Sequence, residues 1–305
     1  MVLRAENLVK TFKKPFQMRS QVRAVRGLSL DVLRGEIFGF VGPNGAGKTT
    51  TIKMMMGLIF PTSGRAFVLG EPVPSGAAKT HVGFLPENPY FYDYLTALEF
   101  LDLVGRLFGL PKAIRRERAT RLLERVGLAR ARDQRLRTFS KGMLQRLGLA
   151  QALVNDPKLV VLDEPMSGLD PIGRKEVRDL IIDLKNEGRT VFFSTHILSD
   201  VELICDRVAI IIQGEVRGVG ALESLLSPKL LTVEVVSREG GSGTAGQPAL
   251  ERDAVVTLPG DADVESYLKE RLAVGARIVS VIPRRESLED VFVREAMGTG
   301  GDAAR

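Results

Sequence analysis

The chain has 305 residues, of which 44% are hydrophobic and 26% charged, with one cysteine and two histidines. This is the ordinary composition of a soluble globular protein, long enough for one large domain and a small one. A single cysteine excludes an internal disulfide framework, and two histidines are too few for a zinc site built by the protein. No apolar run approaches the roughly 18–20 residues that span a bilayer, and residues 1–10 lack the apolar stretch of a secretory signal, so a cytosolic location is expected.

Positive charge is concentrated in one segment. Residues 112–137 hold ten Lys and Arg side chains against three acidic ones, a local balance of +7, whereas the whole chain carries +6. The basic residues of this segment are Lys112, Arg115, Arg116, Arg118, Arg121, Arg125, Arg130, Arg132, Arg135 and Arg137. Such a patch is suited to nucleic acid, lipid headgroups or an acidic partner surface, and it is equally typical of a solvated helix face. The sequence leaves both interpretations open.

The first part of the chain predicts strands, a glycine-rich turn and a helix. Polar and apolar residues alternate over the first 35 residues, and residues 36–41 have the pattern of a buried strand. A glycine-rich turn and a helix over residues 48–57 follow, and residues 81–85 predict another buried strand. This order of strand, loop and helix is the context that a phosphate-binding loop requires.

The middle of the chain predicts a helical region followed by alternating strands and helices. Residues 96–152 have a helical pattern throughout, and Thr96 with Glu99 predicts a capping box at its start. The elements predicted after it are a strand at 159–162, a helix opening at Pro171, a strand at 190–194, a helix at 197–204 and a strand at 208–212. Strands separated by helices of this length indicate a parallel sheet covered by helices.

The sequence pattern changes after Leu226. The elements predicted here are strands at 231–236, 254–258 and 277–282, a helix at 263–272 and a last helix beginning at Ser287. They indicate a small α+β domain, with a flexible loop at 240–248 by composition. The expected division of the chain is an α/β domain at 1–226, an accessory domain at 227–297 and a disordered tail at 298–305.

The strongest motif lies between the strand at 36–41 and the helix that follows it. It fits the pattern G-x-x-x-x-G-K-[ST] and, with the next residue, comprises Gly42, Pro43, Asn44, Gly45, Ala46, Gly47, Lys48, Thr49 and Thr50. Glycines let successive backbone N–H groups surround phosphate oxygens, and the helix adds the positive end of its dipole. Lys48 is expected to contact the β- and γ-phosphates of ATP, and the Thr49 hydroxyl to hold Mg²⁺. The sequence thus predicts binding and hydrolysis of ATP, with a chance glycine-rich turn as the alternative.

A pair of acidic residues follows the apolar run at 159–162. Asp163 and Glu164 come at the C-terminal end of a buried strand, where ligands bind in open α/β sheets. Asp163 suits Mg²⁺, directly or through water, and Glu164 suits the role of general base. A strand that ends in two solvated acids is the alternative interpretation. A simple kinase or GTPase would also possess both motifs.

Further features distinguish the chain from such kinases and GTPases. Residues 138–143, with the sequence TFSKGM, are followed by Gln145 and Arg146 and resemble the LSGGQ signature of ABC-type ATPases. Residues 167–170, SGLD, resemble the D-loop of that family, His196 its switch histidine, and Phe12 the aromatic residue that stacks on adenine. The resemblance covers roughly residues 1–225. It implies an α/β core with a parallel sheet and helices, an antiparallel β subdomain and a helical subdomain at about 88–156.

The resemblance also implies a homodimer in which two chains bind two ATP molecules head to tail. From one subunit each site would take Lys48, Thr49, Asp163, Glu164 and His196. Ser140 and Gly142 of the other subunit would hydrogen-bond the γ-phosphate, as suits a serine and a glycine just before a helix. Asp170 would then lie at the dimer contact.

The chain departs from the family pattern at two places. In the signature, Lys141 and Met143 replace a glycine and a glutamine, but the retained serine and second glycine suffice for the phosphate contacts. Where the family has a glutamine after a short strand, this chain has Glu87. Glu87 is expected to contact Mg²⁺ or the attacking water, although its negative charge near the phosphates also allows a structural role.

Other details resemble the bacterial exporter branch of the family, whose permease is a separate chain. They are the runs FLPE at 84–87, SKGM at 140–143 and SLEDVF at 287–292. The resemblance implies a homodimer docked on a transmembrane permease at the cytoplasmic face of the membrane, without nucleic acid as a partner. The alternative is a soluble ABC ATPase of nucleic-acid repair or translation, with residues 112–137 as the binding surface. A regulator that binds nucleotide without hydrolysis is disfavoured by Glu164. No motif selects a cargo.

Overall fold

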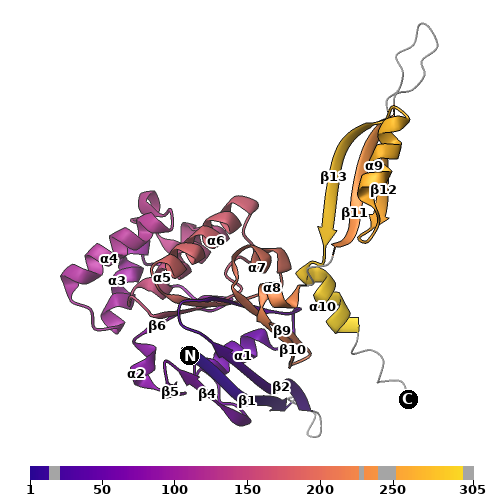
Figure 1. The fold of residues 1–305 in the computed structure, drawn as a ribbon. Coiled ribbons are helices and arrows are strands. Elements are labelled where there is room, and N and C mark those ends of the chain that lie inside the picture. The colour runs from indigo at the N-terminus through magenta and orange to yellow at the C-terminus, as the bar shows by residue number, and fades with distance from the viewer. Residues whose placement is uncertain (14–20, 227–229, 240–251, 298–305) are drawn as a thin grey trace. The chain divides into compact units, whose positions relative to one another are not determined.

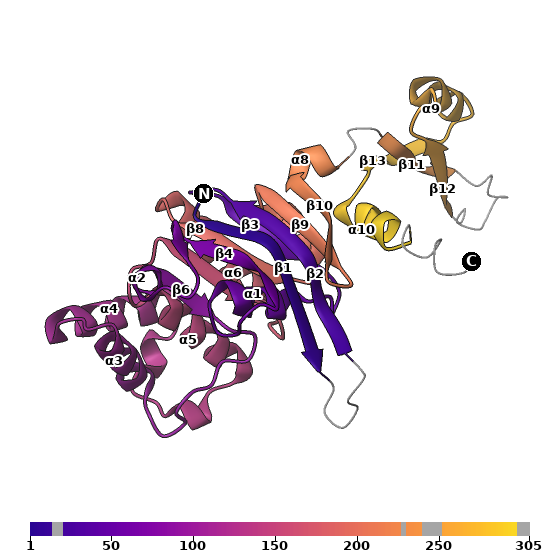
Figure 2. The same cartoon turned by 90° about the horizontal axis from the view of Figure 1, so that it is seen from below.

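The computed structural model describes residues 1–13, 21–226, 230–239 and 252–297. It separates into two compact units, Met1–Leu222 and Glu223–Arg305, whose elements are labelled in Figure 1 and seen from below in Figure 2. The loop predicted at 240–248 and the tail predicted at 298–305 lie outside the described residues.

The centre of the first unit is a six-stranded sheet in the order β10-β9-β3-β8-β7-β6. In chain order its strands are β3 (Ile37–Val41), β6 (Val82–Leu85), β7 (Leu159–Asp163), β8 (Thr190–Thr195), β9 (Arg207–Ile212) and β10 (Glu215–Ala221). All neighbours from β9 to β6 run parallel, and β10 is antiparallel to β9. Every residue of β3, β7 and β8 is buried, as in a helix-covered parallel sheet. The strand order places the loops after β3, β8, β7 and β6 along one edge.

An antiparallel sheet of the first unit has the order β2-β1-β4-β5. Its strands are β1 (Leu3–Lys13), β2 (Gln21–Val32), β4 (Ser63–Val68) and β5 (Glu71–Pro72). Helix α1 (Lys48–Met55) contacts β1, β4 and β7 and therefore lies between the two sheets (Figure 1). The buried core here includes Phe40 and Phe192, whose ring centroids are 5.6 Å apart. The short helix α2 (Gly76–Lys79) contacts β6.

Two helices cover the opposite face of the six-stranded sheet, α6 (Pro171–Asn186) and α7 (Leu198–Ile204) (Figure 1). Asp170 caps α6 because its Oδ1 atom accepts a hydrogen bond from Gly173 N at 2.8 Å. Pro171 takes the first position of the helix, where its fixed φ is favourable. The central sheet is thus covered by helices on both faces, as predicted.

A group of helices between β6 and β7 forms a helical region. Its members are α3 (Ala97–Leu107), α4 (Lys112–Arg125), the 3₁₀ turns η1 (Ala129–Ala131) and η2 (Leu136–Thr138), and α5 (Lys141–Leu153). The predicted capping box is present, with Thr96 and Glu99 exchanging side-chain and backbone hydrogen bonds. The region is not helical throughout, which corrects the prediction for 96–152. Gly109 and Gly127 adopt left-handed backbone angles that end α3 and α4, and Pro111 precedes α4.

Strands β4, β5 and β10 were not assigned from the sequence. β10 contains Gly218 and Gly220, and β4 contains Gly64, so their intrinsic preference for extended structure is low. Pairing with β9 and β1 supplies the stability that the residues themselves lack. Gly64 is required sterically, because a Cβ there would lie 2.3 Å from the carbonyl oxygen of Asn7.

The second unit is a three-stranded antiparallel sheet in the order β12-β11-β13 with helices. Its elements are α8 (Leu222–Leu225), which begins at the division, β11 (Leu230–Glu239), β12 (Arg252–Pro259), α9 (Val264–Ala273), β13 (Arg277–Arg285) and α10 (Leu288–Met297). Val233 and Val235 of the central strand are buried, and α9 packs against β13. Helix α10 follows Ser287, whose hydroxyl accepts a hydrogen bond from Asp290 N. This unit has the predicted α+β composition.

Candidate functional site

The glycine-rich loop connects the end of β3 to the start of α1. Gly45 and Gly47 have φ angles of 81° and 105°, in the left-handed region that favours glycine. Space also requires glycine at position 47, because a Cβ there would lie 2.4 Å from the carbonyl oxygen of Ala24. Helix α1 begins at Lys48, so its first backbone N–H groups lie beside a cavity of about 220 Å³.

Most of the predicted loop residues line this cavity. They are Pro43, Asn44, Gly45, Gly47, Lys48, Thr49 and Thr50, together with Glu87 and Glu164 from the predicted acidic positions. Gly42 and Ala46 hold the loop instead: Gly42 N donates to Thr195 O at 3.3 Å, and Ala46 O accepts from Gly214 N at 2.9 Å. Ala24 also lines the cavity. Sequence reasoning missed it, because its proximity comes from the antiparallel sheet and not from any motif.

Lys48 is the charged group at the centre of the site, and its side chain is only 5% exposed. Its Nζ atom donates to Gly42 O at 2.6 Å and lies 3.3 Å from Pro43 O. Nζ also lies 3.1 Å from Oε1 of Glu164, in an ion pair without the geometry of a hydrogen bond. A buried ammonium needs such partners because an unpaired buried charge is costly. The lysine is therefore held by its own loop and by the carboxylate that follows β7.

A hydroxyl group on β8 organises the acidic pair. Ser194 Oγ donates to Asp163 Oδ1 at 2.6 Å and accepts from Glu164 N at 3.0 Å. Burial raises the pKa of the Asp163 carboxyl, although the nearby hydroxyls of Ser194 and Thr49 oppose the shift. Oδ2 of Asp163 is buried and has no hydrogen-bond partner among the described residues. Ser194 was assigned no role from the sequence. The available signal was a buried serine directly after the apolar run at 191–193.

Glu164 is held from two sides. Its Oε2 atom lies 2.9 Å from Nδ1 of His196, while Oε1 faces Lys48. Because an ionised carboxylate only accepts hydrogen bonds, we assign the proton to Nδ1 of the imidazole. Glu164 is buried and has a φ of 51°, a left-handed angle that non-glycine residues seldom adopt and that often marks functional sites. The adjacency of β7 and β8 brings the glutamate and the histidine together.

Thr49 and Glu87 complete the polar side of the cavity. Thr49 Oγ1 donates to Oε2 of Glu87 across 3.4 Å, and Glu87 follows the edge strand β6. With Asp163 they form a set of hard oxygen donors of the kind that binds Mg²⁺ together with substrate phosphates. The unpartnered Oδ2 of Asp163 fits such an ion. The described residues contain no cluster of three or more His, Cys, Asp or Glu side chains that would hold a metal alone.

Among the predicted site residues that do not line this cavity, Gly42, Ala46, Asp163 and His196 contact residues that do. The remaining three are Ser140, Gly142 and Phe12. Ser140 is the N-cap of α5, with Oγ accepting a hydrogen bond from Met143 N at 3.3 Å, and Gly142 lies in the first turn. Phe12 on β1 is 42% exposed, and the ammonium of Lys10 lies 5.1 Å from its ring centroid. None of the three predicted residues lines the cavity that the phosphate-binding loop forms within one chain.

Helix α5 also contacts the segment that follows Glu164. Gln145 is buried, and its Nε2 atom donates to Pro165 O at 2.9 Å. The side chain of Lys141 covers Gly168, where a Cβ would lie 2.5 Å from the lysine Nζ. From the sequence, Lys141 was named as a replacement for glycine and as part of the run SKGM, and no contact was predicted for its side chain. These contacts connect the start of α5 to the acidic end of β7.

Comparison with known proteins identifies the family. The family described as ABC transporter matches residues 25–167. An uncharacterized ABC transporter ATP-binding protein of Nostoc sp. is 44% identical over 300 residues, which cover 96% of this chain and 89% of that protein. This chain belongs to the ABC transporter ATP-binding proteins. The predicted family is confirmed.

Two further ABC proteins extend the comparison. The Nod factor export ATP-binding protein I of Burkholderia orbicola is 36% identical over 277 residues, covering 88% of this chain and 91% of that protein. A dimeric ATP-binding cassette solved in a post-hydrolysis state with ADP and phosphate matches with a TM-score of 0.66 and 25% identity, covering 72% of this chain and 98% of that one. The predicted ABC fold and the predicted ATPase activity are confirmed. Among the described residues, no helix has both the length and the apolar character to cross a bilayer.

Proposed function

We propose that this ABC ATPase powers export through a permease that is a separate chain, and that two copies form a head-to-tail dimer with ATP sites at the interface. Export is supported by the similarity to a Nod factor export ATP-binding protein. Dimer formation is supported by the dimeric cassette of similar fold. A separate permease is in keeping with the described part of the chain, which has no helix suited to a membrane span.

The observation that carries the proposed chemistry is the position of Glu164. Its carboxylate lies between Lys48 and His196 and lines the cavity beside the phosphate-binding loop. In our proposal Lys48 binds the β- and γ-phosphates, and Glu164 accepts a proton from the attacking water. His196 holds the glutamate in place through Nδ1 and leaves the other ring nitrogen for the substrate.

Magnesium belongs to the same proposal. Thr49, Asp163 and Glu87 are the residues that would hold Mg²⁺. Thr49 and Glu87 line the cavity, and Asp163 lies beside the Thr49 hydroxyl with a buried oxygen that has no partner among the described residues. When bound, Mg²⁺ neutralises charge that develops on the phosphate oxygens. Ser194 then has a positioning role, since it fixes Oδ1 of Asp163 and leaves Oδ2 for the ion.

A second chain completes the site in this proposal. Ser140 and Gly142 lie at the start of α5 and do not line the cavity of their own chain. The N-terminus of a helix of this length is suited to an anion, because its first N–H groups lack partners within the helix. We assign these two residues to the γ-phosphate bound by the partner subunit, and Phe12 to the adenine base.

The test of the chemistry is Glu164→Gln, measured as Mg²⁺-dependent ATP hydrolysis. Loss of a general base lowers the rate by between about 10²- and 10⁴-fold, while ATP binding persists and an ATP-bound dimer accumulates on gel filtration. Glu117→Gln, at an exposed glutamate of α4, is the matched control and is expected to keep the wild-type rate. A wild-type rate in Glu164→Gln would remove Glu164 from the proposed role.

The test of the assembly is co-purification from native membranes. An exporter subunit is expected to bring a polytopic membrane protein with it. Nucleic acid or ribosomes in its place would favour the alternative of a soluble ABC ATPase, for which the basic residues 112–137 would be the binding surface. The relatives named as transporter proteins favour the first outcome.

A further inference from the structure

A second charged cavity lies away from the ATP site, among α4, the turn after α5 and the turn after α6. Its volume is about 260 Å³. We call it the arginine cavity, because four guanidinium groups line it against two carboxylates; the charged residues are Arg118, Arg121, Arg125, Arg189, Asp156 and Glu187. The balance of these side chains is +2, and the cavity shares no residue with the cavity of the phosphate-binding loop.

Ion pairs neutralise only part of this charge. Asp156 lies 2.7 Å from Arg189 and 3.8 Å from Arg118, and Glu187 lies 2.6 Å from Arg125 and 3.1 Å from Arg189. Burial alone would raise the pKa of Glu187, but hydrogen bonds and charges from Arg125 and Arg189 lower it below its ordinary value. Both carboxylates are therefore already engaged, and they hold three guanidiniums at the cavity wall.

Arg121 has no such partner. Among the described residues it makes no ion pair and no side-chain hydrogen bond, although it lines the cavity with the paired arginines. A guanidinium has five N–H donors in a planar arrangement that matches phosphate oxygens in pairs. Arg118 and Arg189 also donate to the carbonyl oxygens of Val154 and Pro157. The paired arginines still retain donors, because these bonds and the carboxylate contacts together use fewer than the five N–H groups of each guanidinium.

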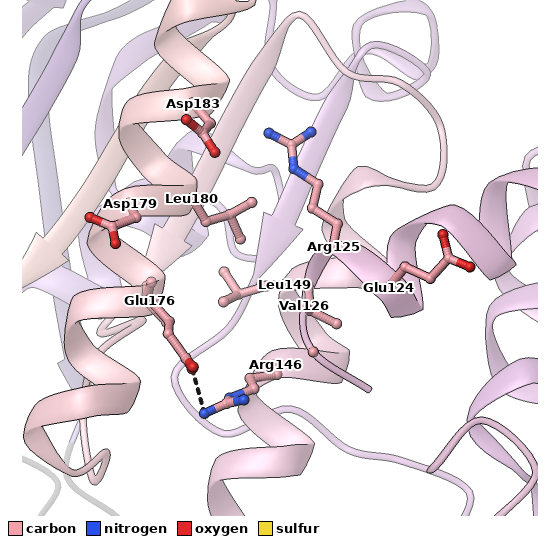
Figure 3. Close-up of a pocket in the computed structure, with 11 residues that line it drawn as sticks. Glu124, Arg125, Val126, Arg146, Leu149, Glu176, Asp179, Leu180 and Asp183 are labelled. Atoms are coloured by element: carbon pink, nitrogen blue, oxygen red, sulfur yellow. Dashed lines mark ion pairs between the residues drawn. The ribbon is translucent and has the colours of Figure 1, made fainter. Parts of the chain in front are cut away.

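The neighbouring cavity on the other side of Arg125 has the opposite charge. It measures about 290 Å³ and is shown in Figure 3, with four carboxylates against two arginines among its lining residues. One of these arginines, Arg146, is paired with Glu176 at 2.5 Å. Asp179 and Asp183 of α6 are further acidic members of the lining. An anion would be repelled there, so the sign of charge distinguishes the two cavities.

We infer that the arginine cavity binds a phosphate group of a small anion with at least two negative charges, separate from the ATP site. The unpaired Arg121, the remaining donors of the paired arginines and the local charge of +2 all favour this ligand class. A bound phosphate would connect α4 to the turns at 156 and 187–189, which lie far apart in the sequence. A soluble anion and a lipid headgroup both carry such a phosphate. The vesicle experiment below distinguishes these two sources.

The experiment measures pyrophosphate binding to the full chain by calorimetry without Mg²⁺. Three variants are compared: Lys48→Ala, which weakens phosphate binding at the loop, and the same variant with either Arg121→Ala or Arg116→Ala. Arg116 is the matched control, an exposed arginine of the same helix that lies outside the cavity. We expect Arg121→Ala to weaken binding by about tenfold or more, because one charge-assisted contact contributes that much. Arg116→Ala should weaken it by less than about twofold.

The source of the phosphate is tested by co-sedimentation with phosphatidylcholine vesicles that contain or lack phosphatidic acid. Binding to phosphatidic acid that is lost with Arg121→Ala and competed by pyrophosphate indicates a lipid headgroup. Pyrophosphate binding that depends on Arg121, without vesicle binding, indicates a soluble anion. Equal effects of Arg121→Ala and Arg116→Ala, or no binding by either assay, would overturn the inference.

Discussion

Asp163 and Glu164 are adjacent in the chain, yet their surroundings differ, and we propose different tasks for them. Asp163 is fixed by the Ser194 hydroxyl and keeps a free buried oxygen, which suits a metal ligand. Glu164 is reached by Lys48 and His196, which suits a group that handles a proton next to the phosphates. The sequence predicted both roles from the motif. The partner Ser194 is 31 residues from Asp163 and was found only in the structure.

At the residue scale we predict that Asp102→Asn destabilises the protein at neutral pH. Asp102 accepts hydrogen bonds from Arg115 and Arg106, both at 2.7 Å, and connects α3 to α4. Burial alone would raise the pKa of this carboxyl, but the two arginines lower it below the ordinary 3.8. Loss of charge-assisted bonds at a side chain that is 20% exposed costs about 1–2 kcal/mol. Urea unfolding at pH 7 measures the difference.

The pH dependence of this variant has a defined sign. The pKa of Asp102 is lower in the folded protein than the ordinary value of 3.8, which holds in the unfolded chain. The stability contributed by such a carboxyl is fully present above pH 3.8 and is lost as the pH falls through the pKa of the folded protein. The wild type and Asp102→Asn should therefore converge below pH 3.8. Asp133→Asn is the control, because its pair with Arg132 is exposed and should contribute less than about 0.5 kcal/mol. A constant difference at all pH values would contradict the ion-pair explanation.

At the scale of elements, the N-terminus of helix α5 allows two roles of Ser140 to be tested separately. Ser140 caps the helix through its hydroxyl, and we propose that the same residue contacts the γ-phosphate bound by a partner chain. Aspartate is as good an N-cap as serine. It would, however, place a carboxylate against the phosphate, which is electrostatically unfavourable.

We therefore predict that Ser140→Asp keeps the stability of the wild type within about 0.5 kcal/mol but lowers ATP hydrolysis by about tenfold or more. Thermal unfolding and a phosphate-release assay measure the two effects. Ser75→Asp is the matched control, because Ser75 caps α2 in the same way and lies outside the site. Wild-type hydrolysis in Ser140→Asp would contradict the placement of this residue at a phosphate.

Prediction of elements succeeded where the signal was local. The capping box of Thr96 and Glu99 and the apolar run of β7 depend on residues close in the chain, and both were predicted. The breaks in the helical region were missed, since Gly109 and Gly127 interrupt a pattern that continues on either side. β10 was missed because its glycines give a weak local preference and its stability comes from pairing with β9.

At the scale of the whole molecule, we predict that inactive variants complement one another. Lys48→Ala has a defective loop, and Ser140→Asp has a defective signature. In a mixed head-to-tail dimer, one site combines the intact loop of the Ser140→Asp chain with the intact signature of the Lys48→Ala chain. Mixing the two variants should restore ATP hydrolysis to a substantial fraction of the wild-type rate. Mixing Lys48→Ala with Glu164→Gln is the control. Lys48 and Glu164 belong to the same half of each composite site, so every site of this mixed dimer contains one of the two substitutions. Equal rates in both mixtures would contradict the composite site.

The sequence by itself determined the family, the α/β fold class and the phosphate-binding loop. These depend on residues that are neighbours in the chain and carry their chemistry in their order, as from Gly42 to Thr50. Only the tertiary structure decided which side chains meet. The order β3-β8-β7-β6 brings Lys48, Glu164 and His196 together, and the packing of α4 against two distant turns creates the arginine cavity. Such contacts arise from strand order and helix packing, which the energy of the whole fold selects, and no local pattern encodes them.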